Sequence, residues 1–259
     1  MSITDFTKAL YVPGYIYSKL FGKGQSKSGD VFVSDSSLDQ NTAYNAELRI
    51  DWITGCCHDL ARFEATRKLA EELWRSPFIH SKGLNRYTDR LENGWEVKLL
   101  YSTEESDCNY KHFSLVVPGT ALAILDIFET FRLLRFLHAN NFNMTRFDVA
   151  SDIFDANLLD LNYMYRLCEE GEIAGIRRYE IDGKGKVGKS PVLTLYLGSR
   201  SSNKYVRFYN KLIETGLDRM AELMEVVGLY WHRLELELKK HEANQFLDCI
   251  VGLPDEIGR

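Results

Sequence analysis

Apolar positions recur with two different periods along this chain, and the periods predict both helices and strands. Residues 59–74 carry apolar side chains at helical spacing, Leu69 and Leu73 among them, which predicts an amphipathic helix. Residues 47–55 (ELRIDWITG) combine β-branched and aromatic residues in a short run, which indicates a strand.

The first half of the chain follows the order β-α-β-β-α-β. Strands are predicted at 47–55, 95–102, 110–117 and 143–154, and helices at 59–74 and from Pro118-Gly119 to about Asn140. This order is typical of the split βαβ arrangement, whose sheet is antiparallel.

The second half repeats the theme. A helix is predicted at 158–170, strands at 173–181, 191–199 and 205–211, a helix at 213–227, a strand at 229–240 and a last helix from about Glu242. We therefore expect an α+β fold with a mainly antiparallel sheet, helices on one side and two ferredoxin-like halves. The predicted domains are a loosely ordered arm at 1–45, an N-terminal half at 46–145 and a catalytic half at 146–259, continuous with the first because no Pro/Ser linker separates them.

Composition narrows the class of protein. The 259 residues are 45% hydrophobic, enough for a core, and the five cysteines include no C-x-x-C pair, which argues against disulfides and a zinc knuckle. The most apolar helical stretch, 120–141, contains two acidic residues and two arginines, so it is expected to be a core helix and no membrane contact is expected. The predicted location is the cytoplasm of a bacterial cell.

The formal net charge of -5 conceals a strongly basic segment at 177–211. This segment carries +7 and leaves -12 for the remainder. Its cations are Arg177, Arg178, Lys184, Lys186, Lys189, Arg200, Lys204, Arg207 and Lys211. The segment can hold a polyanion such as DNA, or it can be a solvated basic hairpin.

Residues 183–190 (GKGKVGKS) match the phosphate-loop pattern G-x-x-x-x-G-K-[ST]. That loop requires a following helix, whose N-terminal amides face the phosphates. Here the next residues, 191–199, are strand-like, so a basic hairpin turn is the favoured interpretation.

An R-x-Y-x-K block places Arg207, Tyr209 and Lys211 at a spacing of two. A phenol loses its proton only near pH ~10. Neighbouring cations would favour the phenolate, and they could also hold a phosphate. The alternative is a strand tyrosine that packs across the sheet.

Two strands carry acidic residues on one face. Alternation puts Asp148 and Asp152 on one face of 146–152, and Glu235 and Glu237 on one face of 233–239. Carboxylate ligands suit Mg²⁺ or Mn²⁺, and no H-x-H or H-x-x-x-H pair suggests a histidine site. The alternative is a solvated face on which Arg146 and Arg233 act as counter-ions.

Four stretches, in this order, resemble the replication initiation factor family, the Rep_trans type of rolling-circle initiators and relaxases of plasmids, filamentous phages and integrative elements. They are ELRIDWITG (47–55), RFDVASD (146–152), LTLYLGSRSSNKYVRFYNK (193–211) and HRLELELKK (232–240). The resemblance extends from about Glu47 to Ala243, and the R-x-Y-x-K block followed by the R-x-E-x-E strand is its most specific part.

The resemblance implies an HUH-endonuclease-like core and an origin-specific DNA nickase that rejoins strands through a 5′-phosphotyrosine. It implies Tyr209 as the nucleophile, with Arg207 and Lys211 beside the phosphate. Asp148 and Glu235 match the metal-binding positions, with Asp152 and Glu237 as further candidates. Asn210 stands where many relatives have aspartate, so any role for that acid is in question.

The implied cofactor is Mg²⁺ or Mn²⁺, and the implied partner is replication-origin DNA, single-stranded at the nick site. A host helicase and a second copy of the chain are further candidate partners. The candidate DNA-binding residues are Lys184, Lys186, Lys189, Arg200 and Lys204.

Two other classes of function remain open. One is a non-catalytic DNA-binding module in which Tyr196, Tyr205 and Phe208 stack on single strands. The other is a phosphate-loop NTPase that depends on Lys189.

Overall fold

The computed structural model describes residues 46–103, 111–155, 157–183, 193–223 and 229–252, and the predicted arm at 1–45 lies outside these ranges. The chain divides into two compact units. The first unit contains the described residues of Ile50–Asp148 and the chain from Leu238 to Gly252, and the second contains those of Val149–Glu237 and Ala46–Arg49.

Strands of the first unit follow the order β2-β3-β4-β5-β1-β6, and the pairs from β2 to β1 are antiparallel. The strands are β1 (Ala46–Cys57), β2 (Ile79–Lys82), β3 (Asp89–Glu92), β4 (Lys98–Tyr101), β5 (Phe113–Pro118) and the first part of β6 (Asn143–Ile153). The helices are η1 (Leu60–Arg62), α3 (Phe63–Trp74), α4 (Gly119–Leu122), α5 (Ile127–Ala139) and α9 (His241–Val251).

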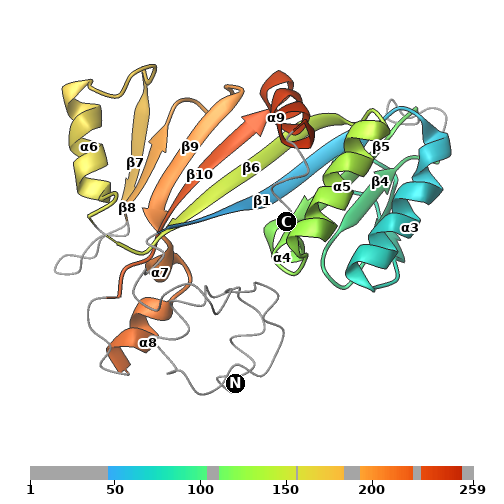
Figure 1. The fold of residues 1–259 in the computed structure, drawn as a ribbon, viewed down its shortest axis with the longest axis horizontal. Helices are drawn as coiled ribbons and strands as arrows, with labels where there is room; N and C mark the ends of the chain where they lie inside the picture. The colour runs from blue at the N-terminus through green and yellow to red at the C-terminus, as the bar shows by residue number, and fades with distance from the viewer. Residues whose placement is uncertain (1–45, 104–110, 156, 184–192, 224–228, 253–259) are drawn as a thin grey trace. The chain divides into compact units, whose positions relative to one another are not determined.

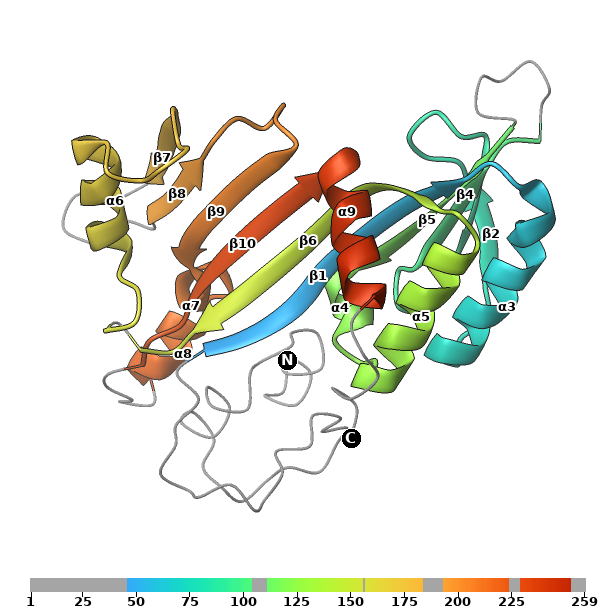
Figure 2. The ribbon, with the colours of Figure 1, turned by 45° about the horizontal axis from the view of Figure 1, so that its top comes forward.

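Helices α3 and α5 lie side by side against the strands of the first unit (Figures 1 and 2). Their apolar stripes are buried, with Leu73 of α3 and Leu134 of α5 almost without exposed surface. The indole of Trp74 donates a 2.8 Å hydrogen bond to the carbonyl of Ala121, which satisfies the buried N–H group. The periodicity read from the sequence therefore identified the helices that cover this sheet.

The long helix predicted from Gly119 is interrupted. Asp126 begins α5 as its N-cap, and Asp126 and Glu129 form a capping box in which each side chain accepts from the other residue's backbone amide. A capping box satisfies amides that a continuous helix would have bonded to preceding carbonyls, so the box marks a new start. The sequence analysis also missed the β2–β3 hairpin, whose strands have only four residues each.

The last helix, α9, packs against the start of β6. The side chain of Asn244 accepts a 2.8 Å hydrogen bond from the amide of Met144 and donates to the Met144 carbonyl. The rings of Phe246 and Phe147 meet edge to face, with their centroids 4.9 Å apart. These contacts tie the C-terminal helix to the first unit.

Strands of the second unit follow the order β6-β10-β9-β8-β7. The remaining elements are α6 (Leu161–Glu170), β7 (Tyr179–Gly183), β8 (Leu193–Leu197), β9 (Lys204–Asn210), α7 (Lys211–Glu214), α8 (Leu217–Leu223) and β10 (His232–Lys239). The helix predicted at 213–227 is divided at Gly216, whose φ of +73° belongs to the left-handed region.

Helix α6 covers one face of this second set of strands. Its Leu161 and Cys168 pack with Leu195 of β8 and Phe208 of β9 in one buried cluster. The prediction of an α+β fold with a mainly antiparallel sheet is confirmed. Within the described ranges, no helix combines the length and the apolar character that crossing a membrane requires.

Candidate active site

Alternation along β9 separates a core face from a polar face. Phe208 points into the cluster under α6, so Arg207 and Tyr209 point to the opposite face. In the antiparallel pairing of β8 with β9, Tyr196 lies opposite Arg207 and Thr194 opposite Tyr209. The polar face of the second unit therefore presents the R-x-Y-x-K block and its cross-strand neighbours together.

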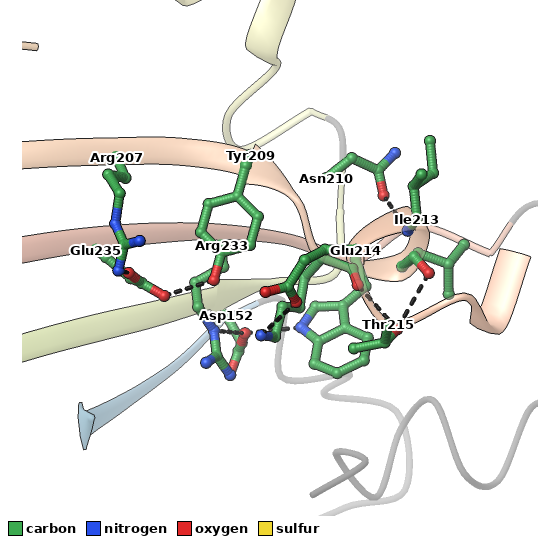
Figure 3. A network of polar contacts seen from close by, with 12 residues as sticks. Asp152, Arg207, Tyr209, Asn210, Ile213, Glu214, Thr215, Arg233 and Glu235 are labelled. Carbon is green, nitrogen blue, oxygen red and sulfur yellow. Dashed lines mark hydrogen bonds and ion pairs between the residues drawn. The ribbon is translucent and has the colours of Figure 1, made fainter. Parts of the chain in front are cut away.

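Glu235 of β10 connects Arg207 and Tyr209 through its two carboxylate oxygens. The hydroxyl of Tyr209 donates a 2.5 Å hydrogen bond to Oε1. The guanidinium of Arg207 forms an ion pair with Oε2. Figure 3 shows the three side chains converging from the two neighbouring strands. The family resemblance had assigned Tyr209 to nucleophilic attack and Glu235 to metal binding.

The expectation that neighbouring cations lower the pKa of Tyr209 is wrong. Burial raises its pKa far above the ordinary value of 10.0, and the negative charge and hydrogen bond of Glu235 raise it further. Only 7% of Tyr209 is exposed, so little water is available to solvate a phenolate. Arg233 acts in the opposite direction but does not offset these effects.

Lys211 and Asn210 follow Tyr209 at the start of α7. The ammonium of Lys211 lies 5.5 Å from the centroid of the Tyr209 ring and pairs with Glu214 at 2.6 Å. The side chain of Asn210 caps α7 by accepting a 3.0 Å hydrogen bond from the amide of Ile213. An aspartate could accept the same bond, so the departure at Asn210 preserves the cap.

Asp152 belongs to a buried triad. Its Oδ1 accepts from the indole of Trp231 at 2.7 Å and from Nε of Arg233 at 2.8 Å, while its Oδ2 accepts from Nη2 of Arg233 at 2.7 Å. Asp152 has no exposed surface, and Arg233 is 4% exposed. Both oxygens are thus engaged within the protein, and we interpret Asp152 as a structural counter-ion. The sequence analysis missed Trp231, although a tryptophan directly before an acidic strand was the available signal.

Asp148, the last residue of the Ile50–Asp148 segment of the first unit, is also held by an arginine. Arg146 donates from Nε to Oδ1 at 2.8 Å and from Nη2 to Oδ2 at 2.5 Å, and its guanidinium lies 5.0 Å from the ring centroid of Trp52. The alternative in which Arg146 and Arg233 act as counter-ions thus describes the contacts correctly. That alternative is wrong in expecting a solvated face, because the carboxylates of Asp148 and Asp152 are buried.

The carboxylate oxygens of Asp148, Glu235 and Glu237 have the chemistry that Mg²⁺ or Mn²⁺ prefers. Among the residues that the structure describes, no three acidic, histidine or cysteine side chains come together as a metal site. Asp148 and Glu235 each form an ion pair with an arginine.

The predicted DNA-binding residues fall into two groups. Lys184, Lys186 and Lys189 lie outside the described residues. Arg200 and Lys204 are described and exposed, in and directly after the turn that joins β8 to β9.

The phosphate-loop pattern at 183–190 is bracketed by strands. Gly183 pairs with Leu193 in the antiparallel ladder of β7 and β8. β8 begins at Leu193, with two residues between it and the end of the pattern, where a phosphate loop needs the first turns of a helix. The described residues on either side of the pattern thus lie on paired antiparallel strands, as the hairpin interpretation predicts, and residues 184–192 lie outside the described ranges.

Comparison with known proteins identifies the class to which this arrangement is similar. Residues 142–256, which include both acidic strands and the R-x-Y-x-K block, match the model of the replication initiation factor family. The resemblance recognised in the sequence is confirmed over that part of the chain.

A solved structure gives the same result for the fold. The rolling circle replication initiator protein from Geobacillus stearothermophilus superimposes with a TM-score of 0.61 over 80% of this chain and 79% of that one, at 19% sequence identity. A comparison with curated proteins found no match.

Proposed function

We propose that this protein initiates rolling-circle replication by nicking one DNA strand at an origin, with Tyr209 as the nucleophile. The observation that carries the proposal is the contact between Tyr209 and Glu235 beside Arg207, on two neighbouring strands within the matched region. A nucleophile and a proton acceptor within hydrogen-bond reach are the signature of covalent catalysis by a weakly acidic group.

In the proposed reaction, Oη of Tyr209 attacks the scissile phosphorus and its proton passes to Oε1 of Glu235. The bond between phosphorus and the 3′ oxygen breaks, and the leaving oxygen takes a proton from solvent. The products are a 5′-phosphotyrosine and a free 3′ hydroxyl. Because the phosphodiester bond is exchanged for a phosphotyrosine bond, the strand can later be rejoined by the reverse attack.

The raised pKa of Tyr209 is compatible with this role. The structure holds the hydroxyl protonated and hydrogen-bonded to Glu235, so a free phenolate is scarce at neutral pH. Proton transfer during attack avoids the free phenolate, and positioned general bases accelerate such steps by about 10²- to 10⁴-fold. Arg207 and Lys211 would face the phosphate and offset the charge that develops on its oxygens.

A divalent cation is part of the proposal, with Asp148, Glu235 and Glu237 as the candidate ligands and Mg²⁺ or Mn²⁺ as the candidate ions. Such an ion, held by these residues, would supply polarisation of a phosphate oxygen. The proposed substrate is origin DNA, single-stranded at the nick. A host helicase and a second copy of this chain are proposed as further partners.

The covalent adduct provides the test. Origin DNA is labelled within the fragment downstream of the nick, near the 5′ end that nicking creates. It is incubated with the protein and Mn²⁺, and the mixture is then denatured. We expect a labelled protein adduct whose peptide maps to Tyr209, and no adduct or nick with Tyr209→Phe. Adduct formation at Tyr196 or Tyr205, or nicking by Tyr209→Phe, would overturn the assignment, and DNA binding without any adduct would favour the non-catalytic module.

A further inference from the structure

Two tyrosines and an arginine form an aromatic cluster on the polar face of the second unit. Tyr196 of β8 and Tyr205 of β9 stack with their ring centroids 5.9 Å apart and their planes 14° from parallel. The guanidinium carbon of Arg200, in the turn between these strands, lies 6.0 Å from the centroid of the Tyr196 ring.

Register places this cluster beside the candidate active site. Tyr196 is the cross-strand partner of Arg207, and Tyr205 precedes Arg207 by two positions on the same strand. Residues two apart on a strand share a face, and directly opposed residues have Cβ atoms about 5 Å apart. Tyr196 therefore lies next to the arginine that contacts Glu235.

The three side chains differ in exposure in a way that suits a binding pocket. Tyr205 is 5% exposed and stacks on the Tyr196 ring. Tyr196 is half-buried, whereas Arg200 is exposed. A hydrogen bond with Tyr205 raises the pKa of Arg200, so the guanidinium stays charged beside the two tyrosine rings.

The spacing between Arg200 and Tyr196 is close to that of a sandwich around one planar ring. Bases in DNA stack at about 3.4 Å, so a base held between two planar groups separates them by roughly 7 Å. The guanidinium carbon of Arg200 lies 6.0 Å from the centroid of the Tyr196 ring, so Arg200 must move outward for a base to enter. Stacking on aromatic rings and on arginine planes is a common way for proteins to hold unpaired bases.

We propose that Tyr196 and Arg200 bind one unpaired nucleobase, that of a nucleotide adjacent to the phosphate at Arg207. The inference rests on the proposed function, since it takes Arg207 as a neighbour of the scissile phosphate. The pocket holds the strand in register so that the phosphate meets Tyr209. Because every base offers a flat face, stacking provides position and only modest sequence preference.

The test uses a single strand of origin sequence, about twelve nucleotides around the nick, with a single 2-aminopurine placed at each position in turn, and the Tyr209→Phe protein so that no strand is cut. Stacking quenches 2-aminopurine, so we expect quenching at one position. Tyr196→Leu should remove that quenching and weaken binding about 5- to 100-fold. A matched control is Tyr163→Leu on α6, where Arg166 lies 5.8 Å from the ring of an exposed tyrosine.

Arg200 separates stacking from a simple charge contact. Arg200→Lys keeps the positive charge and loses the planar guanidinium. If the base is held between two planar groups, the quenching of 2-aminopurine should therefore be lost in Arg200→Lys. Full quenching and affinity in Arg200→Lys, or equal behaviour of Tyr196→Leu and Tyr163→Leu, would overturn the pocket. If Tyr196→Leu lowers Tm, the exposed Arg200→Gln carries the same test.

The adduct assay on origin DNA keeps the two ideas distinct. A wild-type adduct together with no quenching at any position rejects the pocket alone. Quenching that depends on Tyr196 without any adduct supports the pocket and rejects nicking by Tyr209.

Discussion

The hydroxyl of Tyr209 donates a 2.5 Å hydrogen bond to Oε1 of Glu235, so the proposed nucleophile and its proton acceptor are already in contact. The bond joins neighbouring strands, β9 and β10, and is buried. Both residues lie on strands, so their hydrogen bond forms without rearrangement of a loop. The proton therefore has a short path from Tyr209 to Glu235.

Replacing Glu235 with glutamine tests its role as proton acceptor. Glu235→Gln keeps a group that can accept the Tyr209 hydrogen bond, but an amide does not take up the proton at neutral pH. We expect the nicking rate to fall by about 10²- to 10⁴-fold, with affinity for single-stranded DNA changed less than about threefold. Single-turnover nicking and fluorescence anisotropy measure the two quantities.

The exposed Glu180→Gln, on β7, is the matched control and should retain the nicking rate. A Glu235→Gln protein that nicks at the wild-type rate would show that the proton leaves Tyr209 by another route.

Metal dependence is the second prediction. If Asp148 and Glu235 take up Mg²⁺ or Mn²⁺, nicking should stop in excess EDTA and return when either ion is restored. Asp148→Asn should raise the Mn²⁺ concentration needed for half-maximal nicking, because it removes a charged ligand. Isothermal titration of Mn²⁺ into the protein provides a readout independent of activity, and nicking at full rate in EDTA would reject the cofactor.

The Asp152–Arg233 pair should matter for stability. Asp152→Ala leaves the guanidinium of Arg233 buried without its counter-ion, which costs about 3–5 kcal/mol in the free energy of unfolding. Replacing both residues, as Asp152→Leu with Arg233→Met, removes the isolated charge and should recover much of that loss.

Urea unfolding of the two variants measures the difference. A loss below about 1 kcal/mol for Asp152→Ala would contradict a structural role and would reopen the assignment of Asp152 as a metal ligand.

The lysines at 184, 186 and 189 are predicted to bind phosphates. Replacing Lys184, Lys186 and Lys189 with glutamine should reduce the slope of log affinity against log salt by about 0.7 for each phosphate of a single strand that is no longer neutralised. The same variant should still form the Tyr209 adduct at low salt. An unchanged slope would assign these lysines to a solvated turn.

His232 should make stability depend on pH. Burial lowers its pKa from 6.5 to about 4, and its ring stacks on that of Tyr230 with centroids 4.2 Å apart. Between these pH values the unfolded chain binds the proton and the folded chain does not. The free energy of unfolding should therefore fall as the pH is lowered from about 6.5 towards 4, by up to about 3 kcal/mol.

Unfolding in urea at several pH values, with His232→Phe for comparison, measures this contribution. The slope between pH 4 and 6.5 should be smaller in His232→Phe than in the wild type. Equal slopes in wild type and His232→Phe would show that the ring is protonated in the folded protein.

Much of the fold was determined by the sequence alone, because local periodicity reports which face of an element is buried. The strands carrying Asp148, Tyr209 and Glu235 were all predicted, and so was the face of each strand on which these side chains lie. The breaks at Asp126 and Gly216 were missed because apolar residues continue on both sides, and only capping and backbone geometry mark the interruption.

The electrostatic state of the site was decided only by the tertiary structure. Sequence shows charges and their spacing, but it does not show how far water is excluded or which oxygen each arginine contacts. Tyr209 was expected to be acidified by Arg207 and Lys211, yet burial and Glu235 raise its pKa while the two cations pair with Glu235 and Glu214. Contacts between residues far apart in the sequence and the exclusion of water both arise only in the folded protein. Removal from water changes the energy of a charged group as strongly as its neighbouring charges do.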